Sequence, residues 1–417
     1  MTPSLLRIVS LPALPLTVVA AQHHASAQAT SRDSLAAMAT ALVTTVSPAV
    51  GERSHTEVQI TRPMLGVHGA RADGVLQYAA MLNAERWTMP DGEPIAGIWG
   101  EGFVERRHPH TVLHELMLSG ALHYGTARMS VAGGRGFVPF GTDDPMVRPF
   151  TTYPANHHLS QVMERVQFVA AAAIRERAAI ELATFNGDEP GSPTSAPQWN
   201  RFGDSSAARA KVWANPWVEI LGSAAAVRSP EFVRPDGLDQ RKFSASTRIT
   251  PSRRSLEYAL VEWARTDEHY RGRQIVTYGT GLAETLFRRQ AWSVALRVEG
   301  TTRPEDERLL DPFRSARPPN HLLMQGMTRW HILSAQLARS VRIGNGVHAT
   351  LFAEVESAPL LRRVLLDPRD VIGASHSVFF IAGVRLGAGA MPSRVGRYGA
   401  GAGGAETNVE LNMGHEH

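Results

Sequence analysis

Residues 292–300 read WSVALRVEG, and residues 347–357 read VHATLFAEVES. In both stretches apolar and polar side chains alternate, so an extended strand would have one apolar face and one face that carries charges. Residues 377–386, SVFFIAGVRL, repeat the alternation near the end of the chain. This period of two predicts β-strands rather than helices.

The same alternation recurs through most of the chain and predicts about fifteen strands. They cover residues 56–71, 75–86, 112–124, 127–138, 159–174, 177–186, 205–214, 217–227, 241–250, 256–265, 275–288, 292–300, 326–340, 347–357 and 376–388. Four of these strands place a carboxylate where a soluble β-sandwich would have its dry core, at Glu181, Glu219, Glu262 and Glu284. Unpaired charges are rarely tolerated in such a core, so the pattern disfavours a soluble sandwich.

The links between the predicted strands alternate in length. The short links are 72–74, 125–126, 175–176, 215–216, 251–255, 289–291 and 343–346. The long links are 87–111, 139–158, 187–204, 228–240, 266–274, 301–325 and 358–375. Short periplasmic turns and longer extracellular loops are typical of a transmembrane β-barrel, whereas a sandwich has no reason for this regularity.

The positions of the short turns constrain the number of strands. A barrel with both ends in the periplasm has an even number of strands, and a short turn follows each even-numbered strand. The strand at 56–71 precedes a short turn, so another strand must come before it, and residues 41–50, ALVTTVSPAV, can supply it. The sequence therefore predicts an all-β, antiparallel up-and-down transmembrane barrel of about 16 strands, with 14 as the alternative.

The beginning of the chain has the features of an export signal. Arg7 precedes an apolar run over 8–21, and Ala27-Gln28-Ala29 forms a cleavage signature. The run is too short to span a bilayer, and two prolines interrupt it. The predicted organisation is a signal peptide (1–29), an N-terminal segment that can include the first strand (30–55), a transmembrane barrel (56–389) and a Gly/Ala-rich tail (390–417).

Composition excludes several classes of function. The chain of 417 residues has no cysteine, which excludes disulfides, cysteine zinc sites, thiol catalysis and iron–sulfur clusters. The 43 basic residues are balanced by 39 acidic ones without any basic run, so no nucleic-acid partner is expected. The expected partners are the lipid bilayer of the outer membrane and small polar solutes, and the oligomeric state is left open.

Four stretches carry a family resemblance. They are WGEGFVERRHPHTVLHE (99–115), GGRGFVPFGTDDPMVRPF (133–150), LATFNGDEP (182–190) and LLDPFRSARP (309–318). Through them the chain resembles bacterial outer-membrane porin-like barrels of a poorly characterised family. The resemblance implies a location in the outer membrane and passage of solutes, and it transfers no catalytic residue.

Histidines cluster in two of the long links. The candidate metal ligands are His108, His110, His114, His157 and His158, with two aspartates, Asp143 and Asp144, nearby. Imidazole with carboxylate suits divalent transition metals such as zinc, copper or nickel. The sequence thus predicts a possible metal site at the extracellular rim. The alternative is a set of rim histidines bonded to backbone or water.

The polar faces of the strands supply candidates for the wall of a pore. These are Arg297, Glu299, Glu354, Glu356 and Arg385. A charge that faces lipid at mid-depth costs about 2–4 kcal/mol, so these side chains are expected to face the lumen. The alternative is that the charges only pair with one another and stabilise the wall. The link at 139–158 is the best candidate for a loop that folds inward as a constriction. Mixed charges imply weak selectivity and do not favour anions over cations.

Enzyme motifs are not evident. Gly133-Gly134-Arg135-Gly136 lacks the ending of a phosphate-binding loop, and neither a nucleophile elbow nor a zinc-protease motif occurs. The predicted function is an outer-membrane channel for passive diffusion of small polar or charged solutes, without a cofactor. The alternatives are a barrel that binds or confers resistance to transition metals, and a barrel enzyme.

Overall fold

The structure is a computed structural model of the chain. It describes residues 32–48, 53–72, 75–90, 110–142, 148–152, 161–175, 177–230, 237–251, 255–306, 324–344, 346–362, 373–392 and 408–410. The predicted signal peptide lies outside these residues. Among the described residues, no helix has the length and apolar composition needed to cross a membrane.

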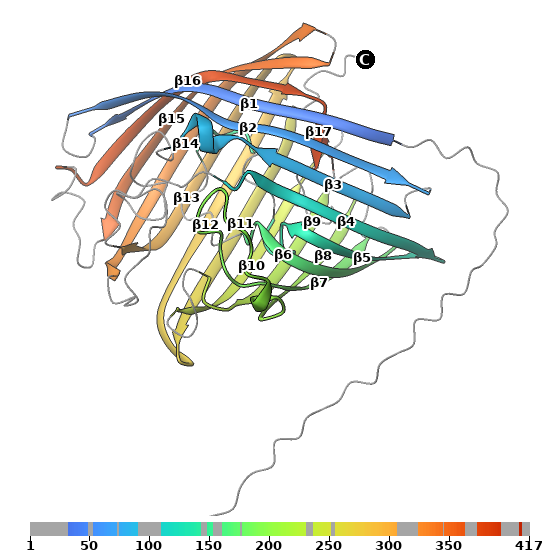
Figure 1. Ribbon diagram of the computed structural model, residues 1–417. Helices are drawn as coiled ribbons and strands as arrows, with labels where there is room; N and C mark the ends of the chain where they lie inside the picture. Colours follow the sequence, from blue (N-terminus) through green and yellow to red (C-terminus); the bar gives the residue numbers. More distant parts are fainter. Residues whose placement is uncertain are drawn as a thin grey trace, which may run out of the picture.

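Sixteen antiparallel strands of the described chain close into a barrel in sequence order (Figure 1). They are β1 (Arg32–Ser47), β2 (His55–Arg71), β3 (Leu76–Asn83), β4 (Leu113–Tyr124), β5 (Ala127–Gly136), β6 (Arg165–Ile174), β7 (Ala178–Phe185), β8 (Ser205–Asn215), β9 (Val218–Val227), β10 (Asp239–Ile249), β11 (Leu256–Tyr270), β12 (Arg273–Arg289), β13 (Trp292–Asp306), β14 (Met324–Gly344), β15 (Val347–Arg362) and β16 (His376–Ala388). The barrel closes where β1 pairs with β16, with Ala37 opposite Ala388 and Ser47 opposite Val378. The predicted fold class and the count of 16 are confirmed.

Two parts of the prediction differ from the structure. The first strand begins at Arg32, before the apolar run at 41–50 from which it was predicted. The earlier part was not predicted because its residues are mostly small and alternate only weakly in polarity. The link expected at 266–274 is instead the end of a long hairpin, in which a two-residue turn joins β11 to β12. Both turn residues, Arg271 and Gly272, have positive φ. The strands at 256–265 and 275–288 were predicted, but the link between them was predicted too long. The reason is that both faces of the hairpin are polar near the turn, with Asp267 on one face and Glu268 on the other.

Short elements outside the barrel are few among the described residues. A helical turn, α1 (Glu85–Thr88), follows β3, and a 3-10 turn, η3 (Trp199–Arg201), lies between β7 and β8. In the segment predicted as a Gly/Ala-rich tail, β17 (Ala390–Pro392) pairs with β18 (Asn408–Glu410). None of these elements interrupts the barrel wall.

The outer face of the barrel is apolar. On β13, Val294, Leu296 and Val298 are 39%, 45% and 56% exposed. Arg297 and Glu299, which point to the opposite face, are each 1% exposed. The same outward apolar positions occur on other strands, for example at Leu118, Leu182, Leu333 and Leu351. Water-soluble monomers rarely expose a contiguous apolar surface of this kind, and a lipid-facing barrel requires one.

Candidate functional site inside the barrel

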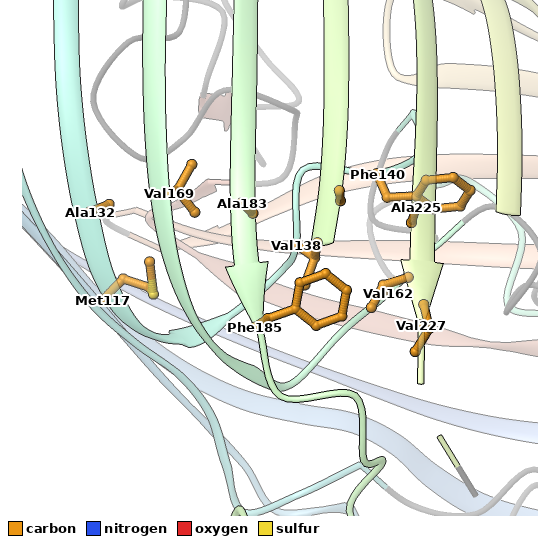
Figure 2. Close-up of a cluster of buried hydrophobic side chains, with 11 residues drawn as sticks. Met117, Ala132, Val138, Phe140, Val162, Val169, Ala183, Phe185, Ala225 and Val227 are labelled. Atoms are coloured by element: carbon orange, nitrogen blue, oxygen red, sulfur yellow. The ribbon is translucent and has the colours of Figure 1, made fainter. Parts of the chain in front are cut away.

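The described residues 137–142 and 148–152 of the long link between β5 and β6 lie inside the barrel. Its first part packs on the inner wall, where Val138 and Phe140 join an apolar cluster with Phe185 and Ala225 (Figure 2). The amide nitrogen of Gly141 donates a hydrogen bond to Ser223 Oγ on β9 at 3.0 Å. The link therefore leaves β5 and lies against the wall formed by β7 to β9.

The next described part of the link, residues 148–152, lies against the other side of the barrel. Arg148 donates a hydrogen bond to Glu262 on β11 at 2.8 Å. Phe150 is fully buried in a cluster that includes Leu260 and Leu282. The carbonyl oxygen of Pro149 accepts hydrogen bonds from Gln336 on β14 and Arg385 on β16, at 2.6 and 3.0 Å.

Two threonines attach the link to β15. The hydroxyl of Thr151 donates to Glu354 Oε2 at 3.1 Å. The single hydroxyl hydrogen of Thr152 is shared between Glu354 Oε1, at 3.0 Å, and Glu356. From β2, the guanidinium of Arg62 donates to the carbonyl oxygens of Phe150 and Thr151. The described residues of the link thus contact β2, β9, β11 and β13 to β16, on opposite sides of the barrel. A constriction at 139–158 stays a prediction.

A buried charge cluster lies on the wall behind the link. Arg297 on β13 is 3.2 Å from Glu356, 3.8 Å from Glu284 and 3.9 Å from Glu299. The guanidinium also donates to the carbonyl oxygen of Thr152 at 3.2 Å and stacks on the Phe150 ring at 4.6 Å. A single cation therefore contacts three carboxylates and the link.

The structure brings the five candidate pore residues to one region. Arg297 and Glu299 lie on β13, Glu354 and Glu356 on β15, and Arg385 on β16, and each of the last three hydrogen-bonds the link. Prediction from sequence missed Thr151, Thr152 and Gln336, which hydrogen-bond Glu354. It also missed Arg62 and Arg148, which bond the carbonyl oxygens of the link and Glu262. Nothing in the local sequence marks these residues, because their partners are far away along the chain.

The histidines predicted to bind metal are only partly described. His108, His157 and His158 lie outside the described residues. His110 Nδ1 is 2.8 Å from Glu85 Oε2, His114 Nδ1 is 2.7 Å from Glu164 Oε1, and the two rings lie 5.0 Å apart. Among the described residues no three potential ligands are placed to hold a metal ion together. Metal binding at this rim stays a prediction.

Glu164 hydrogen-bonds several residues of this rim, so its protonation is expected to affect the stability of the rim. Its Oε1 accepts hydrogen bonds from the amide and hydroxyl of Thr111 and lies beside His114. Burial opposes its ionisation, but the hydrogen bond from His114 and the charges of His114, His110 and Arg135 outweigh burial and hold the pKa of Glu164 below its ordinary value. The ionised Glu164 side chain therefore stabilises the folded state. This contribution to the free energy of unfolding is complete above about pH 4.3 and is lost as the pH falls through the lowered pKa.

Hydrogen exchange at the Thr111 amide tests this effect. After correction for intrinsic exchange, protection in the wild type is expected to fall as the pH is lowered from neutral to about 3, below the ordinary pKa of a glutamate. The variant Glu164→Gln keeps the shape of the side chain but has no charge to lose, so its protection should be lower and nearly independent of pH. Equal pH dependence in both proteins would contradict the assignment.

Comparison with protein-family models and with curated proteins finds no match. Among solved structures, the chain is similar to an anion-selective porin from Comamonas acidovorans, with 12% identity, a TM-score of 0.51, and coverage of 86% of this chain and 100% of that one. OprB from Pseudomonas putida is also similar, with 10% identity, a TM-score of 0.49, and coverage of 86% and 94%. The chain therefore has the fold of bacterial outer-membrane porins.

Proposed function

We propose that this protein is a channel of the bacterial outer membrane through which small polar and charged solutes diffuse passively. The observation that carries the proposal is the opposite chemistry of the two faces of a closed barrel. Apolar side chains cover the outside, as at Val298, while charged side chains such as Arg297 lie inside. A barrel with a polar interior and an apolar outer band is the architecture of water-filled membrane channels.

The inward link would determine which solutes pass. It narrows the lumen between the wall at β9 and the wall at β11 to β16, where Arg148 and Arg297 lie close to glutamates and Arg385 donates a hydrogen bond to the link. Solutes that cross such a constriction exchange part of their hydration for contacts with charged and hydroxyl groups. Size and polarity would then limit passage, and the proposal assigns no catalytic residue.

Single-channel recording in planar lipid bilayers tests the proposal. Detergent-purified protein that is folded, as judged by heat-modifiable migration on gels, is expected to give stable open steps, and a heat-denatured sample should give none. A folded barrel without conductance would overturn the channel proposal. Recording with added zinc or copper tests the rim histidines separately, since block that is lost on replacing His110 and His114 would support metal binding.

A lipid-facing outer wall predicts a position-dependent cost for a charge. Val298→Arg is expected to lower the free energy of unfolding in lipid vesicles by about 2–4 kcal/mol, because Val298 is near the middle of β13 and faces outward. Val294→Arg, closer to the end of the same strand, is the matched control and should cost about 0–1 kcal/mol. Equal costs at both positions would contradict the membrane placement.

A further inference from the structure

Cationic side chains gather at the end of the barrel that bears the short turns, some on the inner face of strands and two in an exposed turn. The set, called the basic mouth here, consists of Arg128 (β5), Arg175 and Arg177 (the turn between β6 and β7), Lys211 (β8), Arg248 (β10), Arg288 (β12) and Arg342 (β14). The charge cluster described above lies deeper in the barrel, so the basic mouth is a separate feature. The proposed function uses none of these residues.

Alternation along the strands places the strand members of the basic mouth on the inner face. Arg128 is two residues from the buried Ser130, and Arg248 is two residues from the buried Ser246. Arg288 is likewise two residues from the buried Leu286. Residues two apart on a strand share a face, so all three arginines face the lumen, and each lies within a few residues of a short turn.

Few carboxylates balance the basic mouth. Glu219 lies 3.7 Å from Lys211 and opposite Arg248 in the pairing of β9 with β10, and Glu257 lies 2.8 Å from Arg288. Four arginines of the basic mouth have no ion pair with any described carboxylate: Arg128, Arg175, Arg177 and Arg342.

The inner wall elsewhere shows a different charge pattern. Near the long links, Arg165 pairs with Glu189 at 3.0 Å. At mid-depth, Arg209 pairs with Glu181 at 2.7 Å, and Arg297 contacts several glutamates. Elsewhere on the wall the described cations therefore lie beside carboxylates, whereas the described residues of the basic mouth include more cations than carboxylates. The lumen is therefore electrostatically asymmetric along its axis.

We propose that the basic mouth concentrates small anions, of the carboxylate and phosphate class, and gives the channel a preference for anions over cations. The inference rests on the proposed channel function and names its substrate class. Guanidinium groups bind carboxylate and phosphate oxygens in a planar, two-point geometry, and clustered like charges at an opening raise the local concentration of counter-ions. Selectivity then arises at the short-turn end rather than at the constriction.

The reversal potential in a potassium chloride gradient tests the proposal. The wild type is expected to favour chloride, and the triple variant Arg128→Gln, Arg177→Gln, Arg342→Gln should lower the chloride-to-potassium permeability ratio about threefold or more at 0.1 M salt, where the Debye length is about 10 Å. The preference should nearly vanish at 1 M salt, where that length is about 3 Å. Single-site Arg342→Gln should give a smaller loss in the same direction.

A matched control is available on the same strand as Arg342. Arg339 lies three residues away, faces outward and stacks on Trp292 at 5.4 Å, so Arg339→Gln should leave the permeability ratio unchanged. A wild type that favours potassium, or a folded triple variant with unchanged selectivity, would overturn the inference and leave the channel function intact. A folded barrel that never conducts would overturn both.

Sidedness gives a second readout with inorganic phosphate as the probe. Because the basic mouth is present at one end only, phosphate added on the short-turn side should reduce the chloride current more than phosphate added on the long-link side. The triple variant should lose this difference. Equal inhibition from both sides in the wild type would contradict a binding region at the short-turn end.

Discussion

Replacing Arg297 with methionine is expected to destabilise the folded barrel by about 3–5 kcal/mol, since removing one partner leaves buried charges uncompensated. Arg297 and the carboxylates of Glu284, Glu299 and Glu356 are each at most 1% exposed, so water cannot replace the lost cation. The loss also removes the hydrogen bond to Thr152 that attaches the link to the wall. The free energy of unfolding, from denaturant titration in lipid vesicles, measures the effect.

A second substitution separates electrostatics from packing. In the double variant Arg297→Met, Glu356→Gln, one buried charge is removed along with its partner, so part of the lost stability should return. Arg339→Met, which changes an outward arginine that stacks on Trp292, should cost well under half as much as Arg297→Met. If the double variant is less stable than the single one, the charges in the cluster are not coupled as the distances indicate.

Replacing residues 148–152 with Gly-Ser-Gly-Ser-Gly is expected to raise the single-channel conductance about twofold or more, because the narrowest part of a pore dominates its resistance. The change removes the side chains of Arg148 and Phe150, which fill the lumen beside β11 to β13. It also removes the hydroxyls of Thr151 and Thr152 that hydrogen-bond β15. Planar-bilayer recording of conductance, and of the largest neutral solute that enters the pore, measures the change.

Two milder variants provide a comparison for the conductance of the Gly-Ser variant. Glu354→Gln with Glu356→Gln weakens the attachment of the link without removing its bulk, so conductance should rise less and the open state should become noisier. Thr194→Gly with Ala196→Gly loosens an exposed part of the link between β7 and β8 and should leave conductance unchanged. Unaltered conductance in the Gly-Ser variant would mean that the link does not constrict the pore.

The sequence alone was enough to predict the strands and the face that each residue occupies. Alternation in polarity depends only on neighbours two positions apart, so it is readable without any tertiary contact, as the stretch at 292–300 shows. The even strand count followed from the turns, and it correctly demanded a strand before 56–71. The method failed at the turn between β11 and β12, where both faces of the hairpin are polar and the alternation disappears.

The inward direction of the candidate pore residues could also be predicted from sequence, because a charge at an alternating position has to face the inside of a barrel. That they line a pore stays a prediction. What each charge contacts could not be predicted. Arg62 meets Thr151, Thr152 meets Glu356 and Arg148 meets Glu262 across separations of 89, 204 and 114 residues along the chain. Such pairs exist only after the barrel has closed and the link has entered it.

The charge asymmetry of the lumen depends on both the sequence and the tertiary structure. The sequence by itself determined that the protein has strands with an apolar and a charged face, because that pattern is a local property of side-chain order. Only the tertiary structure decided that cations and carboxylates meet at the constriction, while Arg128, Arg177 and Arg342, which have no ion pair with a described carboxylate, lie at the short-turn end. The reason is that an electrostatic field depends on distances between strands, which closure of the barrel and the path of its inward link establish.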